Sequence, residues 1–269
     1  MKNYTNQQFP VGRGVKLNSR AGFRKKAAHG DYIHIKRRNM TVNKIKINNI
    51  PAIVWGEKAD KVYLFVHGKM SSKEAAEVFA EIAEEKGYQT ISFDLPGHGE
   101  RVDENERCDI WNGVRDLAIV GDYVFANWKE VSLYACSLGA YFSLNTYNTE
   151  NIKKCLFQSP ILDMEYLIKQ MMVWFAVSEE RLAQEKEVET PIDVMTWDYY
   201  QYVKAHPIQK WNIQTNILFG GKDNLQSLKV VKEFADKFDC VLTIAENSEH
   251  PFMEEGDGQI VDLWLRENI

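Results

Sequence analysis

The stretch Val131 to Ser143 reads Val-Ser-Leu-Tyr-Ala-Cys-Ser-Leu-Gly-Ala-Tyr-Phe-Ser and divides at Ser137. An apolar, strand-like run ends at Ala135, small residues surround the serine, and a helix-compatible stretch follows. A sharp turn from a strand into a helix holds the turn residue in a strained backbone conformation, so that its hydroxyl stands clear of the sheet. We expect Ala135 and Gly139 to be small because they pack against each other. The pattern is G-x-S-x-G with alanine in the first glycine place, and an ordinary strand-to-helix turn can also produce it.

The composition is that of a globular protein. The chain has 269 residues, of which 45% are hydrophobic and 26% charged, and this predicts one large domain that can carry an insertion. No stretch approaches the roughly 18 consecutive apolar residues that a membrane helix requires, and nothing resembles a signal peptide. The cysteines lack metal-type spacing and a dense disulfide pattern, so we expect a reducing, cytoplasmic compartment; they are Cys108, Cys136, Cys155 and Cys240.

Charge is distributed unevenly along the chain. Residues 1–40 hold ten Lys or Arg and one acid, whereas the whole chain carries −5, so residues 41–269 carry −14. An acidic body is poorly suited to nucleic acid or to anionic membranes, and we expect neither as a partner. The basic segment is either a working arm or an upstream extension, because Arg37-Arg38-Asn39-Met40 is what a translated ribosome-binding site and start codon would give. Mapping the native N-terminus by mass spectrometry distinguishes the two.

From residue 41 onward, apolar runs of strand length alternate with amphipathic stretches of helix length. Continuous apolar strands between helices predict an α/β fold with a mostly parallel sheet covered on both faces, and ligands on such sheets lie at the carboxyl ends of the strands. Ser72 is the expected N-cap of the first helix. The predicted strands are 41–47, 50–55, 61–66, 89–93, the elbow strand, 154–158, 217–219 and 241–245, and the helices are 72–86, 110–127, one after the elbow, 226–238 and 257–267.

Residues 162–211 do not fit this alternation, because about 50 residues there separate two strands. The segment is rich in methionine and aromatic residues, and a helical hairpin that packs on the sheet accounts for most of them. A second interpretation is a mainly helical cap whose apolar side overhangs Ser137 and meets an apolar substrate. On that interpretation the pocket is lined by Met171, Met172, Trp174 and Phe175.

Several motifs in this order resemble the α/β-hydrolase family over residues 41–269. They are His67-Gly68, Asp94-Leu95-Pro96-Gly97-His98-Gly99, the elbow at Ser137, and Asp223 and His250 after the last two predicted strands. In that family the triad runs in the chain order serine, acid, histidine. The resemblance implies an α/β-hydrolase domain over 41–269, with a helical cap at about 162–211.

The chemistry of acyl transfer explains these residue types. A serine hydroxyl is a poor nucleophile until an imidazole takes its proton, and we assign Ser137 as nucleophile and His250 as base. Asp223 would orient the imidazole and stabilise the imidazolium, although some family members place the acid where Asp163 stands. The developing oxyanion requires preorganised donors, for which the backbone amides of Lys69 and Leu138 are the candidates.

Three further residues are expected to be structural. His67 would shape the loop that carries the oxyanion donor, His98 would organise the Gly97-His98-Gly99 turn, and Asp94 would accept hydrogen bonds from loop amides. His67 has a second interpretation as a base, but His250 is the histidine that follows the acid strand.

We therefore expect a serine hydrolase that cleaves a carboxylic ester, or a thioester, of a small molecule through an acyl-enzyme, with no cofactor and no metal. One alternative is a small peptidase or amidase, in which acidic residues such as Glu179-Glu180 or 185–189 would hold the substrate amine. Another is a non-catalytic binding protein on the same fold, because fold alone does not fix chemistry. The sequence leaves the natural substrate and the oligomeric state open.

Overall fold

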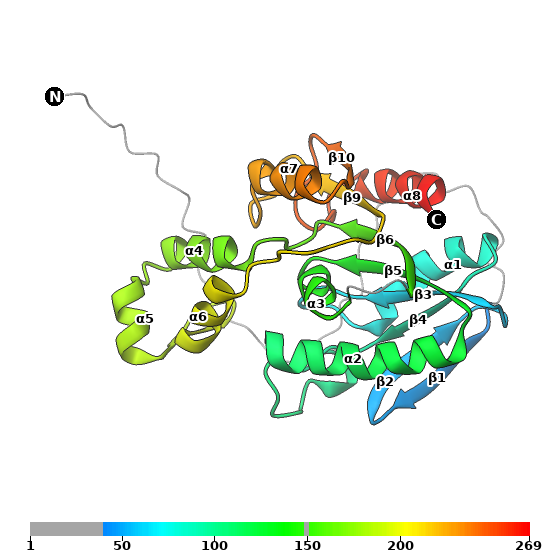
Figure 1. The fold of residues 1–269 in the computed structure, drawn as a ribbon, viewed down its shortest axis with the longest axis horizontal. Helices are drawn as coiled ribbons and strands as arrows, with labels where there is room; N and C mark the ends of the chain where they lie inside the picture. Colours follow the sequence, from blue (N-terminus) through cyan, green and yellow to red (C-terminus); the bar gives the residue numbers. More distant parts are fainter. Residues whose placement is uncertain (1–39, 148–150) are drawn as a thin grey trace. The chain divides into compact units, whose positions relative to one another are not determined.

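An eight-stranded sheet forms the centre of the computed structural model, which describes residues 40–147 and 151–269 (Figure 1). The strand order is β1-β2-β4-β3-β5-β6-β9-β10. β1 and β2 pair antiparallel, β2 is antiparallel to β4, and the remaining pairs are parallel. The strands are β1 Val42–Ile47, β2 Ile50–Trp55, β3 Lys61–Val66, β4 Gln89–Phe93, β5 Glu130–Cys136, β6 Ile152–Gln158, β9 Thr215–Gly220 and β10 Val241–Ala245. The predicted α/β sheet is thus confirmed, whereas the basic segment 1–39 lies outside the described residues.

Alternating side chains of each central strand enter two separate cores, as the two-residue period of a strand requires. In β3, Val62, Leu64 and Val66 face one core, and Tyr63 and Phe65 face the other. The first core packs against α2 (Ile110–Asn127), α3 (Leu138–Thr146) and α7 (Leu228–Lys237), and the second against α1 (Glu77–Glu85) and α8 (Asp257–Asn268). None of the helices in the described residues has the length and apolar character of a membrane span.

The first helix starts differently from the prediction. Residues Lys73–Ala76 form a 3-10 turn, and α1 begins only at Glu77. Ser72 does not cap a helix amide; its hydroxyl donates to the Glu74 carboxylate. The reason is tertiary: both the backbone N–H and the ammonium of Lys73 donate to the buried Asp94 carboxylate, at 2.9 and 2.7 Å, and this holds the turn against the loop after β4.

The insertion at 162–211 contains three helices, α4 (Met164–Trp174), α5 (Glu179–Glu185) and α6 (Trp197–Ala205), which lie together to one side of the sheet in Figure 1. It also contains a hairpin of β7 (Glu187–Glu189) and β8 (Val194–Thr196), which the sequence did not predict. Strands of three residues are too short to show an alternating pattern, and Thr190 closes the turn through its N–H bond to the Asp193 carbonyl at 2.9 Å.

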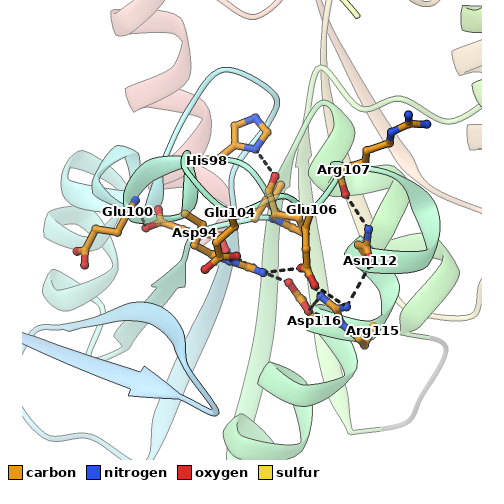
Figure 2. Close-up of polar contacts among 12 residues, drawn as sticks. Asp94, His98, Glu100, Glu104, Glu106, Arg107, Asn112, Arg115 and Asp116 are labelled. Atoms are coloured by element: carbon orange, nitrogen blue, oxygen red, sulfur yellow. Dashed lines mark hydrogen bonds and ion pairs between the residues drawn. The ribbon is translucent and has the colours of Figure 1, made fainter. Parts of the chain in front are cut away.

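A network of buried charges holds the long loop between β4 and α2 (Figure 2). The Arg101 guanidinium donates to the Asp94 carbonyl and to Asp116 on α2, and it pairs with Glu104 and Glu106. Arg115, one residue before Asp116, also binds Glu106 at 2.7 Å. Because breaking a buried ion pair leaves an uncompensated charge, these contacts fix the loop, which contains one short 3-10 helix, η2 (Gly99–Arg101).

Candidate active site

Ser137 lies between β5 and α3 with φ 51° and ψ −120°, the strained conformation expected of a strand-to-helix elbow. Its backbone is tied to the chain that leaves β6. The Ser137 N–H donates to the Gln158 carbonyl, and the Ile161 N–H donates to the Ser137 carbonyl, both at 3.1 Å. These bonds satisfy both backbone groups of the strained residue and hold its side chain at the carboxyl edge of the sheet.

Small residues around Ser137 lie against the end of a neighbouring strand. A Cβ on Gly139 would lie 2.5 Å from the His67 carbonyl and 2.8 Å from that of Val66, so the residue packs on the end of β3. The expected contact between Gly139 and Ala135 stays a prediction. Gly68 faces Ser137 in the same way, since its Cβ would lie 3.0 Å from the serine Cβ. The elbow therefore fits against the neighbouring strand, which the sequence pattern alone does not reveal.

Three side chains far apart in the sequence form one hydrogen-bonded chain. The His250 Nδ1 lies 2.7 Å from Asp223 Oδ2, and its Nε2 lies 2.9 Å from Ser137 Oγ. Because a carboxylate only accepts, the imidazole proton resides on Nδ1, and Nε2 is left to accept from the serine hydroxyl. The Asp223 side chain is fully buried and that of His250 nearly so. The arrangement can transfer a proton from Ser137 to His250.

Asp223, and not Asp163, contacts the histidine. The second oxygen of Asp223 accepts from the backbone amides of Leu225 and Gln226, at 2.8 and 3.2 Å. Asp163 instead caps α4, where its carboxylate accepts from the Tyr166 amide at 2.8 Å. Its place beside the site is fixed by Gln226, whose side chain bonds both the N–H and the carbonyl of Asp163.

Two histidines join the loop after β3 to the loop after β4, which agrees with the structural roles expected of them. His67 Nδ1 donates to the Gly68 carbonyl at 2.7 Å, and its Nε2 accepts from the Leu95 amide at 3.0 Å. His98 Nδ1 donates to the Pro96 carbonyl at 2.9 Å, and its Nε2 accepts from the Met70 amide at 3.0 Å. Both rings are used in their neutral form, and burial lowers the pKa of His67 to about 4.

The two amides expected to bind an oxyanion are available. Within the described part of the chain, the N–H groups of Lys69 and Leu138 donate to no protein acceptor. Leu138 is the first residue of α3, where helix amides are unpaired and favour negative charge. Lys69 lies between Gly68, which meets Ser137, and Met70, which is fixed by His98.

The insertion contacts the loops that carry the site. The Lys69 ammonium pairs with Asp193 in the β7–β8 turn, and Arg107 binds Glu187 through two hydrogen bonds, at 2.8 and 2.9 Å.

Of the predicted pocket residues, Met171 and Met172 are buried, Phe175 is half-buried and Trp174 is 41% exposed. Two cavities, of about 210 and 420 Å³, are lined by none of these four residues, and Ser137 does not line them either. The part of the four residues in substrate binding therefore stays a prediction.

Two polar residues at the site were missed by the sequence analysis, Gln158 and Gln226. Both are buried, and both use the side-chain amide to join loops: Gln226 as described above, and Gln158 by donating to the Pro251 carbonyl at 3.1 Å. A single glutamine at a strand end or before a helix has no sequence signature, so only the fold shows their function as links.

Comparison with solved structures finds this architecture in esterases and other hydrolases. Est1E from Butyrivibrio proteoclasticus, solved with ferulic acid bound, is 16% identical with a TM-score of 0.67, over 84% of this chain and 96% of that one. The mouse α/β-hydrolase domain-containing protein 10 is 15% identical with a TM-score of 0.67, over 84% and 97% of the two chains. An esterase from Pyrococcus furiosus is 17% identical with a TM-score of 0.59, over 84% and 91%. No family model and no curated protein matches the sequence.

These similarities show that the chain has the α/β-hydrolase fold, as the sequence resemblance implied.

Because His67 is buried as a neutral ring, we expect the stability of the protein to depend on pH. The pKa of His67 is about 4 in the folded protein because of burial, against about 6.5 in an unfolded chain. Between these values the unfolded state binds the extra proton, so the free energy of unfolding should fall as the pH drops from 6.5 to 4. The loss should total about 3 kcal/mol.

Urea unfolding of the wild type and of His67→Gln at pH 7 and at pH 4.5 measures how much of this loss in the free energy of unfolding comes from His67. His67→Gln should be less stable at pH 7 but lose less stability on acidification. His206→Gln, at an exposed histidine of α6's C-terminus, is the control and should follow the wild type. Equal pH dependence in all three proteins would contradict the neutral state of His67.

Proposed function

We propose that this chain, which has the α/β-hydrolase fold, is a serine hydrolase that cleaves carboxylic esters through an acyl-enzyme. The observation that carries the proposal is the continuous hydrogen-bonded chain from Asp223 through His250 to Ser137, with the serine in a strained elbow. Such an arrangement supplies a nucleophile, a base and an orienting carboxylate in the geometry that acyl transfer requires.

In the first half of the reaction, Ser137 Oγ would attack the ester carbonyl carbon while its proton moves to His250 Nε2. Asp223 Oδ2 would stabilise the imidazolium that forms, and the N–H groups of Leu138 and Lys69 would bind the oxyanion. Collapse of the tetrahedral intermediate then breaks the C–O bond, and the alcohol leaves with the proton from His250. In the second half, His250 would activate a water molecule that hydrolyses the acyl-serine.

Two observations favour an ester over a peptide substrate. Among the solved structures with this fold, the Pyrococcus furiosus protein is named as an esterase. In addition, three of the five glutamates considered for holding a substrate amine are already paired with cations: Glu179 with Lys204, Glu185 with Arg181, and Glu187 with Arg107. A cytoplasmic location remains part of the proposal, and the four free cysteines are compatible with it.

Labelling with a fluorophosphonate tests the nucleophile. The wild type should be labelled at Ser137 and should hydrolyse p-nitrophenyl acyl esters faster than aminoacyl-anilides. Ser137→Ala should lose both labelling and turnover, the latter by several orders of magnitude, with Tm nearly unchanged because only a hydroxyl is removed. Ser143→Ala, in the same helix and bonded to the Gly139 carbonyl, serves as the control. Labelling that persists at another serine in Ser137→Ala would overturn the assignment.

The two aspartates beside the site provide a matched test of the acid. Asp223→Asn should lower kcat by roughly 10⁴, the scale observed when a triad imidazole is left in the wrong tautomer. Asp163→Asn removes one charge from the N-cap of α4, so it should cost helix stability, about 1 kcal/mol or less, and leave kcat close to that of the wild type. The steady-state kinetics and Tm of both variants decide between them, and a larger kinetic loss in Asp163→Asn would reverse the two roles.

The insertion is proposed to form the cap and to bind the acyl group. Its ion pairs to Lys69 and Arg107 attach it to loops at the carboxyl edge of the sheet, where Ser137 lies. Trp174→Ala should therefore raise KM for long acyl chains more than for acetate, because a longer chain buries more apolar surface. Val173→Ala, at a neighbouring position that is 75% exposed, should change neither. A series of p-nitrophenyl esters measures the effect, and an equal KM change for all chain lengths would remove the basis for an acyl pocket there.

A further inference from the structure

Gln158 touches both the nucleophile and the loop of the base. It is the last residue of β6, and its carbonyl accepts the backbone N–H of Ser137 at 3.1 Å. Its side-chain Nε2 donates to the carbonyl of Pro251, the residue directly after His250, at 3.1 Å. One rigid strand end therefore contacts the backbone of the serine and the backbone that follows the histidine.

The orientation of the Gln158 amide is fixed by its two partners. The Pro251 carbonyl can only accept, so the NH₂ group must face it. The carbonyl of the amide then faces Tyr134, whose hydroxyl donates to Gln158 Oε1 at 2.6 Å. A flipped amide would bring two carbonyl oxygens together at Pro251, which excludes that alternative on electrostatic grounds.

The Tyr134 ring is itself held by packing against other aromatic rings. Its ring stacks on Phe65 with centroids 4.7 Å apart and planes 13° apart, and it also contacts Phe79 at 4.6 Å. All three belong to the core between the sheet and α1. The amide is thus anchored on one side to a packed aromatic core and on the other to the turn that carries His250.

We propose that Gln158 is a positioning residue of the active site, which with Tyr134 sets the distance between His250 Nε2 and Ser137 Oγ. The inference rests on the proposed function, because it concerns the same serine and histidine. Without the bond to Pro251, the His250 turn loses its direct link to the strand end that holds Ser137. Displacements of about 1 Å at a reacting pair can cost about 10²-fold in rate.

A second buried glutamine offers a matched control. Gln89 is 8% exposed, the same as Gln158, and its amide bonds the Gly56 carbonyl, the Ala59 amide and the Trp128 indole. It begins β4, so it lies at the amino edge of the parallel strands, opposite the site. Methionine replaces glutamine in either place with similar volume and no hydrogen bonds.

The test measures kcat, KM, the rate of fluorophosphonate labelling at Ser137, and Tm for the wild type, Gln158→Met and Gln89→Met. Gln158→Met should lower kcat and the labelling rate by about 10- to 100-fold with KM nearly unchanged. The Tm of Gln89→Met should be lower than that of the wild type, whereas kcat per folded molecule should equal the wild-type value. A folded Gln158→Met with wild-type kcat, or one whose kinetics match those of Gln89→Met, overturns the proposal and leaves Gln158 a merely structural residue.

A milder pair of variants decides the matter if Gln158→Met does not fold. Tyr134→Phe removes only the hydroxyl that orients the Gln158 amide, and kcat should fall by about 3- to 10-fold at constant KM. Tyr147→Phe, which removes another buried hydroxyl at the end of α3, should leave kcat unchanged. Unchanged kcat in Tyr134→Phe refutes the inference.

The outcomes also separate this inference from the proposed function. A wild type that is not labelled at Ser137 and hydrolyses no ester contradicts the proposed function itself. A wild type that is labelled and active, beside a Gln158→Met or Tyr134→Phe variant of equal activity, contradicts only the positioning role.

Discussion

The site depends on one backbone constraint, the positive φ of Ser137. Such a conformation costs about 1–3 kcal/mol for a residue other than glycine, and it persists because neighbouring strands fix the elbow on two sides. The end of β3 lies so close that Gly139 cannot carry a side chain. The last residue of β6 bonds the N–H of Ser137, and Ile161 in the segment after β6 bonds its carbonyl. The hydroxyl is thereby aimed at His250 before any substrate arrives.

The loops around this elbow are held by hydrogen bonds and ion pairs of ionisable side chains. His67 and His98 connect the loops after β3 and β4 as neutral rings, and each uses one nitrogen as donor and the other as acceptor. Farther out, Lys73 and Arg101 bind Asp94 as cations. For Lys73, burial lowers the pKa, but the hydrogen bonds to Asp94, Glu100 and Glu74 outweigh it and raise the pKa above its usual value.

The insertion is joined to the rest of the molecule by a shared apolar core as well as by ion pairs, since its buried residues Met171, Tyr200 and Val203 belong to the core that packs against α2, α3 and α7. Its two ion pairs to the site loops, Lys69–Asp193 and Arg107–Glu187, lie on partly or fully exposed side chains. Exposed pairs contribute about 0–1 kcal/mol each and weaken with salt.

The sequence by itself determined the sheet, the elbow with Ser137, and His250 as the histidine of the hydrogen-bonded chain, because each is encoded locally: apolar runs for the strands, small residues around Ser137, and a histidine after the last strand. It left Asp223 and Asp163 as rivals, did not show that Gly139 packs on the end of β3, and missed the β7–β8 hairpin, Gln158 and Gln226. These were decided by tertiary structure, since they depend on which strand ends become neighbours. Asp163 caps a helix while Asp223 reaches His250, and two ordinary glutamines become links only when the sheet brings their loops together.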